Sequence, residues 1–300
     1  MLADKAAPLE QALEPTPGQL LLRRAFGHHG VTFGATVLGL IVALALLAPL
    51  LAPHDPYHQD LTQRLFEPFW HAHKYNPAHL LGTDNLGRDF LSRLIYGSRI
   101  SLLIGFSAML ISGIIGSVLG ITAGYFGGRV DLAITFVITL RLSLPVVLVA
   151  LAVVALVGGS LTVVILVLGL LLWDRFAVVL RSATQQARAM DYVAAAQAAG
   201  CSTARILFSE ILPNILNQLI VVATLEMAHA ILLEAALSFL GLGVQPPLPS
   251  WGLMVAEGKS YMFFDPWLIT FPGLALFLLV LAINLLGDGV RDVTAPEQRN

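Results

Sequence analysis

The feature that most limits how this chain can fold is the recurrence of long apolar segments along almost its whole length. Each is long enough to cross a hydrocarbon layer of about 30 Å at about 1.5 Å per helical residue. The segments span residues 31–52, 100–123, 130–157, 161–180, 214–240 and 266–287. Only 12% of the residues are charged, whereas soluble domains carry about 25%. The pattern predicts an all-α integral membrane protein with six transmembrane helices.

These segments divide the chain into tails, spans and loops. The first apolar run is longer than the core of a cleavable signal peptide, so we expect it to remain as a span. The predicted division is a tail at 1–30, a first span at 31–52, an external loop at 53–98, five spans within 99–290 that enclose a cytoplasmic loop at 181–213, and a second tail at 291–300. The external loop is too short and too polar to build a core of its own.

Glycine and proline mark the interruptions between spans. Residues 124–129 predict a tight turn, and Gly158-Gly159-Ser160 divides what would otherwise be one overlong apolar segment. Residues 241–249 are too rich in glycine and proline to form a continuous helix. We expect this stretch to be re-entrant or to lie at the surface.

Arginine and lysine indicate the orientation, because cytoplasmic loops of membrane proteins are enriched in them. With the amino terminus inside, the internal segments hold Arg23, Arg24, Arg129, Arg181, Arg188, Arg205, Arg291 and Arg299. The external segments hold Arg64, Lys74, Arg88, Arg93, Arg99 and Lys259. Most of these lie in one long loop, where charge has less influence on orientation. Six spans also place both termini on the same side, so we expect cytoplasmic termini.

Charge and cysteine content exclude several classes of protein. The formal net charge is −2 and no basic run is present, which argues against a nucleic-acid partner. Cys201 is the single cysteine, so an internal disulfide and a cysteine-based metal cluster are excluded. In the predicted cytoplasmic loop its thiol would be reduced.

A polar insert from Asp191 to Asn214 separates two of the spans. Residues 192–199 are mostly alanine and favour a helix, which Gly200 is suited to end. Proline is unfavourable inside a helix, so Pro213 marks the start of the next span. Small side chains on such a helix permit close approach to a groove on a partner. The alternative is an ordinary amphipathic surface helix between two spans.

The ends of this insert are similar to the cytoplasmic coupling loop of ABC-importer permeases. The similarity rests on Ala195-Ala196-x-x-x-Gly200 at its start and Leu212-Pro213 at its end. In such permeases the loop receives mechanical work from a separate ATPase. The resemblance assigns ATPase docking to Asp191, Tyr192, Ala194, Ala195, Ala196, Gly200, Arg205, Leu212 and Pro213. The family usually has glutamate where this chain has Ala194.

Other motifs resemble the dipeptide/oligopeptide/nickel branch of these importers, in the same order along the chain. Residues 82–99 are similar to the segment before the second span, residues 234–252 to the end of the fifth span, and residues 271–292 to the sixth span and tail. The motif residues with an expected structural role are Gly82, Asp84, Gly87, Arg88, Asp89, Asn284, Gly287, Asp288, Arg291 and Asp292. The long loop after the first span resembles the C-type permease of such complexes.

This resemblance implies a type I ABC-importer permease fold in a bacterial inner membrane. It implies as partners a homologous B-type permease, two ATP-binding subunits, an external substrate-binding protein and membrane lipid. It implies no cofactor and no resident metal. Cargo is chosen largely by the binding protein, so dipeptides, longer peptides, nickel chelates and glutathione-like compounds all stay open.

Charged residues within spans are candidates for the transport pathway or its gate, because such charges usually face protein or water. We assign Arg141, Thr139, Glu226 and Glu234 to this group. The family commonly has an acidic residue at Thr139 and a proline at Asp174, so the chain departs from its pattern at both places. Alternatively, Pro145 begins a new helix and Arg141 reaches the cytoplasmic interface.

Two other functional classes remain as alternatives. A secondary transporter or channel would show internal repeats or ion-coupling carboxylates. We find no repeat, and Glu226 and Glu234 are the only plausible carboxylates of that kind. A membrane-embedded hydrolase would need a nucleophile beside a base. His229 is the only candidate base within a span and has no evident partner.

Two further patterns suggest sites that we do not assign. The predicted external loop contains His54, His58, His71, His73 and His79. His71-x-His73 could chelate a metal if extended, but we expect solvated histidines because no closed ligand spacing is present. The run Gly252 to Ser260 resembles a phosphate-binding loop but has one residue too many and no preceding strand. We expect no nucleotide site in this chain.

Overall fold

A computed structural model describes residues 26–71 and 74–294 of the chain. Most of both predicted tails lies outside these residues, as do Arg23, Arg24, His73 and Arg299. The described residues contain helices and no strand, only two isolated bridges. The α-helices are α2 His29–Leu46, α3 Ala48–Leu51, α4 Phe90–Phe126, α5 Gly128–Leu142, α6 Val146–Val157, α7 Leu161–Leu171, α8 Trp173–Arg188, α9 Asp191–Ala198, α10 Thr203–Arg205, α11 Leu212–Phe239, α12 Trp251–Gly258 and α13 Trp267–Thr294. Short 3-10 turns lie at Leu61–Gln63 (η1) and Lys259–Tyr261 (η3), and a π-helix at Ile206–Ile211 (η2).

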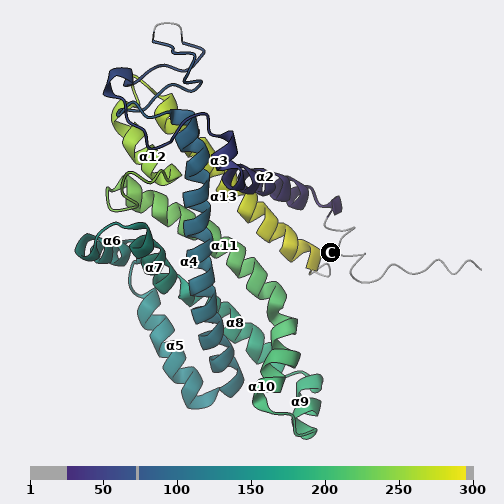
Figure 1. The fold of residues 1–300 in the computed structure, drawn as a ribbon. Helices are drawn as coiled ribbons and strands as arrows, with labels where there is room; N and C mark the ends of the chain where they lie inside the picture. Colours follow the sequence, from purple (N-terminus) through teal and green to yellow (C-terminus); the bar gives the residue numbers. More distant parts are fainter. Residues whose placement is uncertain (1–25, 72–73, 295–300) are drawn as a thin grey trace, which may run out of the picture.

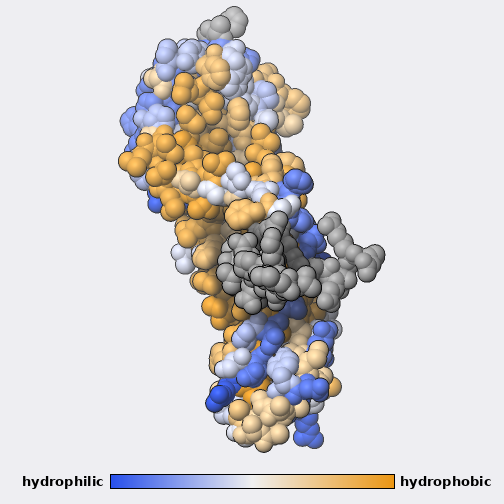
Figure 2. Space-filling view, turned by 90° about the vertical axis from the view of Figure 1, so that its right-hand side faces the viewer, coloured by the Kyte–Doolittle hydropathy of each residue, from blue (hydrophilic) through white to orange (hydrophobic). Residues whose placement is uncertain are grey.

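The prediction of an all-α membrane protein with six spans is confirmed. Five helical stretches are long and apolar enough to cross a membrane, and α5 with α6 makes a sixth span that is bent by 78°. On the face shown in Figure 2, strongly hydrophobic residues are densest in the upper-middle part of the molecule, and hydrophilic residues are more frequent toward its two ends, where they are mixed with apolar ones. This distribution matches a bundle whose sides contact lipid and whose ends contact water.

The long helix α4 forms the axis of the bundle and contacts α2, α7, α8 and α11 (Figure 1). The segment between α3 and α4 lies at one end together with α12, and α9 lies at the opposite end. We call these the loop end and the α9 end. The helices α2 and α13 pack side by side. His28, which precedes α2, bonds to Asp292 near the end of α13, with 3.2 Å between Nε2 and Oδ2.

A stripe of glycines lets α4 and α8 pack closely. A Cβ atom on Gly116 would lie 2.3 Å from the carbonyl oxygen of Trp173, and one on Gly120 would lie 2.6 Å from that of Ala177. One on Gly124 would lie 2.6 Å from the carbonyl oxygen of Arg181. The spacing of four residues puts all three on one face of α4. Such small-residue stripes allow backbone contact between membrane helices, where apolar burial alone gives little driving force.

Several predicted boundaries are corrected. Helix α4 begins at Phe90, so residues 90–98 of the predicted loop are helical. It begins there because the Asp89 side chain accepts a hydrogen bond from the backbone N–H of Ser92 and caps the helix. The predicted turn at 124–129 is shorter, since α4 continues to Phe126 and only Gly127, at φ +65°, separates it from α5.

Two spans are broken within their length. Pro145 precedes α6, as predicted, and ends the helical path of α5. A second break at Leu172 separates α7 from α8. Helix α8 continues to Arg188, so the first part of the predicted loop at 181–213 is helical. Residues 241–249 are non-helical, as predicted.

Candidate functional site

Helix α9 is attached to the end of the bundle through Val193, with the half-buried Ala196 packed against the same apolar cluster. Val193 is fully buried among Leu180 of α8 and Ile206 and Ile211 of the π-helix η2. This packing stabilises the orientation of α9 relative to α8 and η2. Helix α9 lies at the far end of the molecule (Figure 1). The helix therefore projects from the end of the bundle and is packed against it.

The remaining surface of α9 is exposed and rich in alanine. Tyr192, Ala194 and Ala195 are exposed and Ala196 is half-buried. The other residues assigned to docking also lie at this end: Asp191, Gly200, Arg205 and Pro213 are exposed and Leu212 is half-buried. The structure thus brings all the residues assigned to docking onto one end of the molecule.

Gly200 ends α9 as predicted. Its φ is +76°, a left-handed conformation that favours glycine. The N–H of Cys201 donates to the carbonyl of Ala196 at 3.1 Å, and the N–H of Gly200 donates to that of Gln197 at 3.0 Å. These two bonds form a Schellman motif, which satisfies carbonyls that the helix end would leave unpaired.

The next span begins earlier than predicted. Pro213 lies in the first turn of α11, but helical structure already starts at Thr203 and passes through the π-helix η2. A proline removes one N–H donor and its ring clashes with the preceding turn. A wider π turn relieves that clash. The side-chain amide of Asn214 donates to the carbonyl of Glu210 at 2.6 Å and satisfies a carbonyl in this turn.

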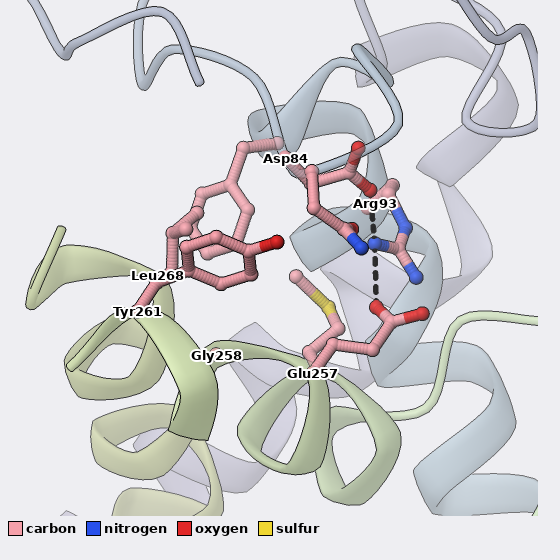
Figure 3. A pocket seen from close by; sticks show the side chains of 9 residues that line it. Asp84, Arg93, Glu257, Gly258, Tyr261 and Leu268 are labelled. Carbon is pink, nitrogen blue, oxygen red and sulfur yellow. Dashed lines mark hydrogen bonds and ion pairs between the residues drawn. The ribbon is translucent and has the colours of Figure 1, made fainter. Parts of the chain in front are cut away.

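At the loop end, a buried ion network joins the predicted external loop to α12 (Figure 3). Asp84 contacts both Arg88, at 2.6 Å, and Arg93, while Glu257 contacts the same two arginines at 3.1 Å and 2.8 Å. The side chains of Arg88 and Arg93 are 0% and 1% exposed. Two buried cations are thus balanced by two carboxylates, as buried charges require.

Glycines set the path of the loop around this network. Gly82 and Gly87 have φ values of +75° and +73°. A Cβ on Gly82 would lie 2.0 Å from the carbonyl oxygen of Phe66, and one on Gly87 would lie 1.8 Å from that of Asp60. Only glycine fits at these contacts.

The expectation of solvated histidines is wrong for His79. This side chain is buried, and its Nδ1 lies 2.8 Å from Asp89 Oδ1 while its Nε2 lies 3.1 Å from Gln63 Oε1. His54 Nδ1 approaches the same Asp89 oxygen at 3.7 Å, so these three residues together could offer ligand atoms to a metal ion. Hydrogen bonds already account for the positions of His79 and Asp89, and we assign no metal here.

Gln63 links this cluster to the start of η1. Its amide nitrogen donates to Asp60 Oδ2 at 2.7 Å. Asp60 also accepts a hydrogen bond from the Thr62 side chain at 2.6 Å. The bonds from Thr62 and Gln63 hold the pKa of the Asp60 carboxyl below its usual value.

The motif residues of α13 pack this helix against its neighbours. A Cβ on Gly287 would lie 2.2 Å from the Thr224 side chain of α11. Asn284 is half-buried, whereas Asp288, Arg291 and Asp292 are exposed near the end of the helix.

Two of the four residues assigned to the pathway do not line the pocket at the helix breaks. Glu234 is fully buried between α11 and α12, where it accepts hydrogen bonds from Ser238 at 2.7 Å and Ser250 at 2.9 Å. Thr139 is exposed, and its hydroxyl donates to the carbonyl of Thr135 within α5 at 2.8 Å.

The other two, Arg141 and Glu226, line one pocket at the two helix breaks. The pocket has a volume of about 260 Å³ and lies between α5, α6, α8 and α11. The guanidinium of Arg141 donates to the carbonyls of Leu144, at 3.4 Å, and Leu171, which are exposed by the two helix breaks. Glu226 is buried and pairs with Arg175 at 3.1 Å.

Asp174 and His229 complete the charged lining of this pocket. The sequence indicated Asp174 only as a departure from the family pattern that bears on the pathway or its gate, did not indicate Arg175, and gave His229 no partner. His229 Nδ1 lies 3.4 Å from Glu226 Oε2. The available signal was the charged pair Asp174-Arg175 inside an apolar span.

Comparison with known proteins decides the family. A sequence model described as "Binding-protein-dependent transport system inner membrane component" matches residues 116–300. A second, described as "N-terminal TM domain of oligopeptide transport permease C", matches residues 16–68. The chain belongs to the binding-protein-dependent permease family. This permease is thus a multi-pass membrane subunit of an ABC importer, and the predicted resemblance is confirmed.

Relatives align over nearly the whole permease. It is 43% identical to the di/tripeptide transport system permease protein DppC of Pseudomonas aeruginosa, over 92% of this chain and 91% of that protein. It is 40% identical to the dipeptide transport system permease protein DppC of Haemophilus influenzae, over 90% and 91% of the two chains. It is 36% identical to the glutathione transport system permease protein GsiD of Pectobacterium atrosepticum, over 95% and 93%.

Among solved structures, the permease resembles a chain of the MetNI methionine ABC transporter in an inward-facing conformation. The TM-score is 0.56 at 19% identity, and the match covers 67% of this chain and 96% of that one. The predicted type I permease fold is confirmed by this likeness.

Proposed function

We propose that this permease forms half of the translocation pathway of a peptide importer in a bacterial inner membrane. The observation that carries this proposal is its 43% and 40% identity to DppC permeases over at least nine-tenths of the chain. The second half of the pathway would come from a homologous B-type permease. An external binding protein would deliver the peptide, and two separate ATPase subunits would hydrolyse ATP.

In this proposal α9 is the element that docks onto an ATPase subunit. Its exposed alanines and Tyr192 suit a groove that admits close backbone approach, and burial of Val193 transmits a push on α9 into α8 and η2. Closure of two ATPases on ATP would draw two such helices together and favour the outward-facing state of the pathway. Hydrolysis and release would favour the inward-facing state again, as a two-state change driven from another chain.

The proposal places both termini and α9 in the cytoplasm. Six spans put the termini on one side, and the bond between His28 and Asp292 places the start of α2 next to the end of α13. The charge distribution agrees once burial is considered. Arg88 and Arg93, counted above as external positive charges, are neutralised by Asp84 and Glu257.

Uptake by cells tests the proposal. A strain that lacks this gene is supplied with labelled dialanine or labelled nickel, with and without the gene restored. Restored dialanine uptake alone is the expected result. Restored nickel uptake alone would assign the importer to a metal cargo. Restoration of neither would show that the cargo is another small solute, and in both of these cases the peptide proposal fails.

A further inference from the structure

We propose that the pocket lined by Arg141, Asp174, Arg175, Glu226 and His229 binds the charged ends of a short zwitterionic peptide on its way through the importer. The inference rests on the proposed function and names a site for its substrate. The ammonium group of the peptide would face Asp174, and its carboxylate would face Arg175, with the charge of Arg141 close by. We call these residues and their apolar neighbours the charged pocket.

The charged residues lie at the middle of the spans that carry them. Glu226 is at the centre of α11, which has 28 residues. Arg175 is at the centre of the Leu161–Arg188 span, and Arg141 is at the centre of the bent span formed by α5 and α6. A charge at the centre of a transmembrane helix costs about 2.5–3.5 kcal/mol on insertion scales and usually faces protein or a water-filled cavity. Several such charges at one place indicate a site that handles a polar solute.

The carboxylate of Asp174 lacks a partner within the described chain and is the first group that a ligand would satisfy. Only 7% of the residue is exposed, yet no described residue donates a hydrogen bond to its carboxylate or forms an ion pair with it. Asp174 is one of the residues that line the pocket. A buried carboxylate without a partner is unfavourable, and an alkylammonium group with three N–H donors would satisfy it.

Arg175 supplies the opposite charge. One of its terminal nitrogens pairs with Glu226, but the side chain as a whole is 59% exposed. The remaining N–H donors of the guanidinium are therefore free to bind a carboxylate, a geometry for which arginine is well suited. Its exposure at the centre of a span also indicates that this face looks onto a pathway or a partner subunit and away from lipid.

Arg141 adds a second positive charge that no carboxylate of the described chain neutralises. Its guanidinium contacts only the backbone carbonyls of Leu144 and Leu171. The pairing of Arg175 with Glu226 therefore leaves one cation, Arg141, and one anion, Asp174, without a charged partner in the same pocket. A molecule that carries one ammonium and one carboxylate group is the complement of such a pocket, whereas a metal cation or a simple anion would match only one half of it.

The size and the remaining lining agree with a small peptide. The volume of about 260 Å³ is below the range of about 300–1,000 Å³ that is typical of sites for drug-sized ligands. Leu142, Leu144, Pro145, Val146 and Leu172 form the apolar part of the lining. They can contact aliphatic side chains of a di- or tripeptide without selecting among them.

Direct binding tests this inference without the binding protein. The complete complex of this permease with its partner permease and ATPases, free of nucleotide and of binding protein, is placed in nanodiscs with dialanine. Binding is followed by saturation-transfer NMR, which detects weak ligands. Dialanine is expected to receive saturation from the wild-type complex. The control peptides are N-acetyl-dialanine and dialanine amide, each of which lacks one terminal charge. Each should compete with dialanine at least about tenfold less well, as expected for loss of one charge-assisted hydrogen bond.

Variants of the pocket make the test specific. Asp174→Asn and Arg175→Gln should each weaken dialanine binding at least about tenfold, and Asp174→Glu should keep more of it. Arg129→Gln, an exposed position of α5 outside the pocket, is the matched control and should bind normally. Gel filtration checks that each complex is assembled, and the two blocked peptides test the inference on the wild-type complex even if a variant fails to assemble.

Three results would overturn the inference. Absence of dialanine binding to the wild-type complex, equal competition by the blocked peptides, or full binding by both pocket variants would show that the pocket is filled by the partner subunit or serves as packing. Dialanine uptake by intact cells separates this failure from that of the proposed function. If the wild-type gene restores uptake while any of these results is seen, the importer is a peptide importer and only the pocket assignment is wrong.

Discussion

The Nη1 atom of Arg175 lies 3.1 Å from Oε1 of Glu226, a residue 51 positions later in the chain. The pair is asymmetric, because the Arg175 side chain is 59% exposed and that of Glu226 is 1% exposed. Loss of the arginine would leave a buried carboxylate behind, whereas loss of the glutamate would leave an arginine that water or a partner can reach. The two halves of the pair should therefore respond differently to mutation.

Arg175→Gln is expected to destabilise the assembled complex more than Glu226→Gln does. The loss should be about 1–3 kcal/mol, the cost of leaving a buried polar group without its partner. Glu226→Gln should cost less, since the amide oxygen can still accept a hydrogen bond from Arg175. Thermal unfolding of the purified complex measures both changes. The double variant should regain part of the stability lost in Arg175→Gln, and the absence of any recovery would contradict the pairing.

Gly200→Asp is expected to leave the permease inserted and assembled with its partner permease but to abolish transport. No heavy atom lies within 4 Å of a Cβ at this position, so the fold has room for a side chain. The new carboxylate would project from the end of α9, on the surface that we propose docks onto an ATPase. Membrane immunoblots and dipeptide uptake measure the two effects.

Gly241→Asp is the matched control for that variant. Gly241 has φ +82°, close to the +76° of Gly200, and it too has open space around its Cβ position. It lies just after the carboxyl end of α11, whereas α9 lies near the amino end of that helix. Both variants incur the same backbone strain, so only a docking role predicts that Gly200→Asp alone loses transport. Normal transport by Gly200→Asp would exclude the docking assignment.

Gly87→Ala is expected to prevent correct folding of the loop end. Its Cβ would overlap the carbonyl oxygen of Asp60 at 1.8 Å, in addition to the strain of about 1–2 kcal/mol for a left-handed residue with a side chain. Gly128→Ala, at φ +52° with open space around it, should show the strain alone. Protease resistance of the assembled complex compares the two, and equal resistance would show that the loop can move aside.

Glu257→Ala is expected to destabilise the attachment of α12 to the loop end. Arg88 and Arg93 would keep Asp84 but lose their second carboxylate, and breaking a buried ion pair typically costs about 3–5 kcal/mol. Glu257→Gln keeps a hydrogen-bond acceptor and should lose less. The midpoint of thermal unfolding reports the difference, and an unchanged midpoint in Glu257→Ala would mean that water replaces the carboxylate.

The lowered pKa of Asp60 leads us to expect that the stability of the loop end depends on pH. Hydrogen bonds from Thr62 and Gln63 lower the pKa of this carboxyl in the folded protein. Its stabilisation is therefore fully present above the unfolded pKa of about 3.9 and is lost as the pH falls through the lower folded value. The stability difference between wild type and Asp60→Asn should be present at neutral pH and vanish in strong acid. A difference that does not change with pH would contradict this role.

Predictions from the sequence were most reliable for features that depend on a single local physical rule. Apolar length fixed the number of spans, because a helix must satisfy its own backbone hydrogen bonds inside lipid. Gly200 and Pro145 were predicted to end and begin helices, and both do. These properties depend on local chain geometry. For the same reason the alanine-rich insert could be recognised as a helix before its surroundings were known.

Boundaries and buried polar groups depended on contacts that local rules do not describe. The start of α4 at Phe90 follows from the cap by Asp89, and the burial of His79 follows from its bond to that same carboxylate. A sequence window contains the residues but not the partners that stabilise them.

The sequence by itself determined the class of this protein, its spans and the short helix α9, because hydrophobic length and helix-ending residues act over short distances along the chain. Only the tertiary structure decided which charges meet. Arg141, Asp174 and Glu226 lie on three different spans, yet two helix breaks and the close packing of α4 against α8 place them around one pocket. Charge pairing acts through space, and in a helical membrane protein the fold alone sets those distances.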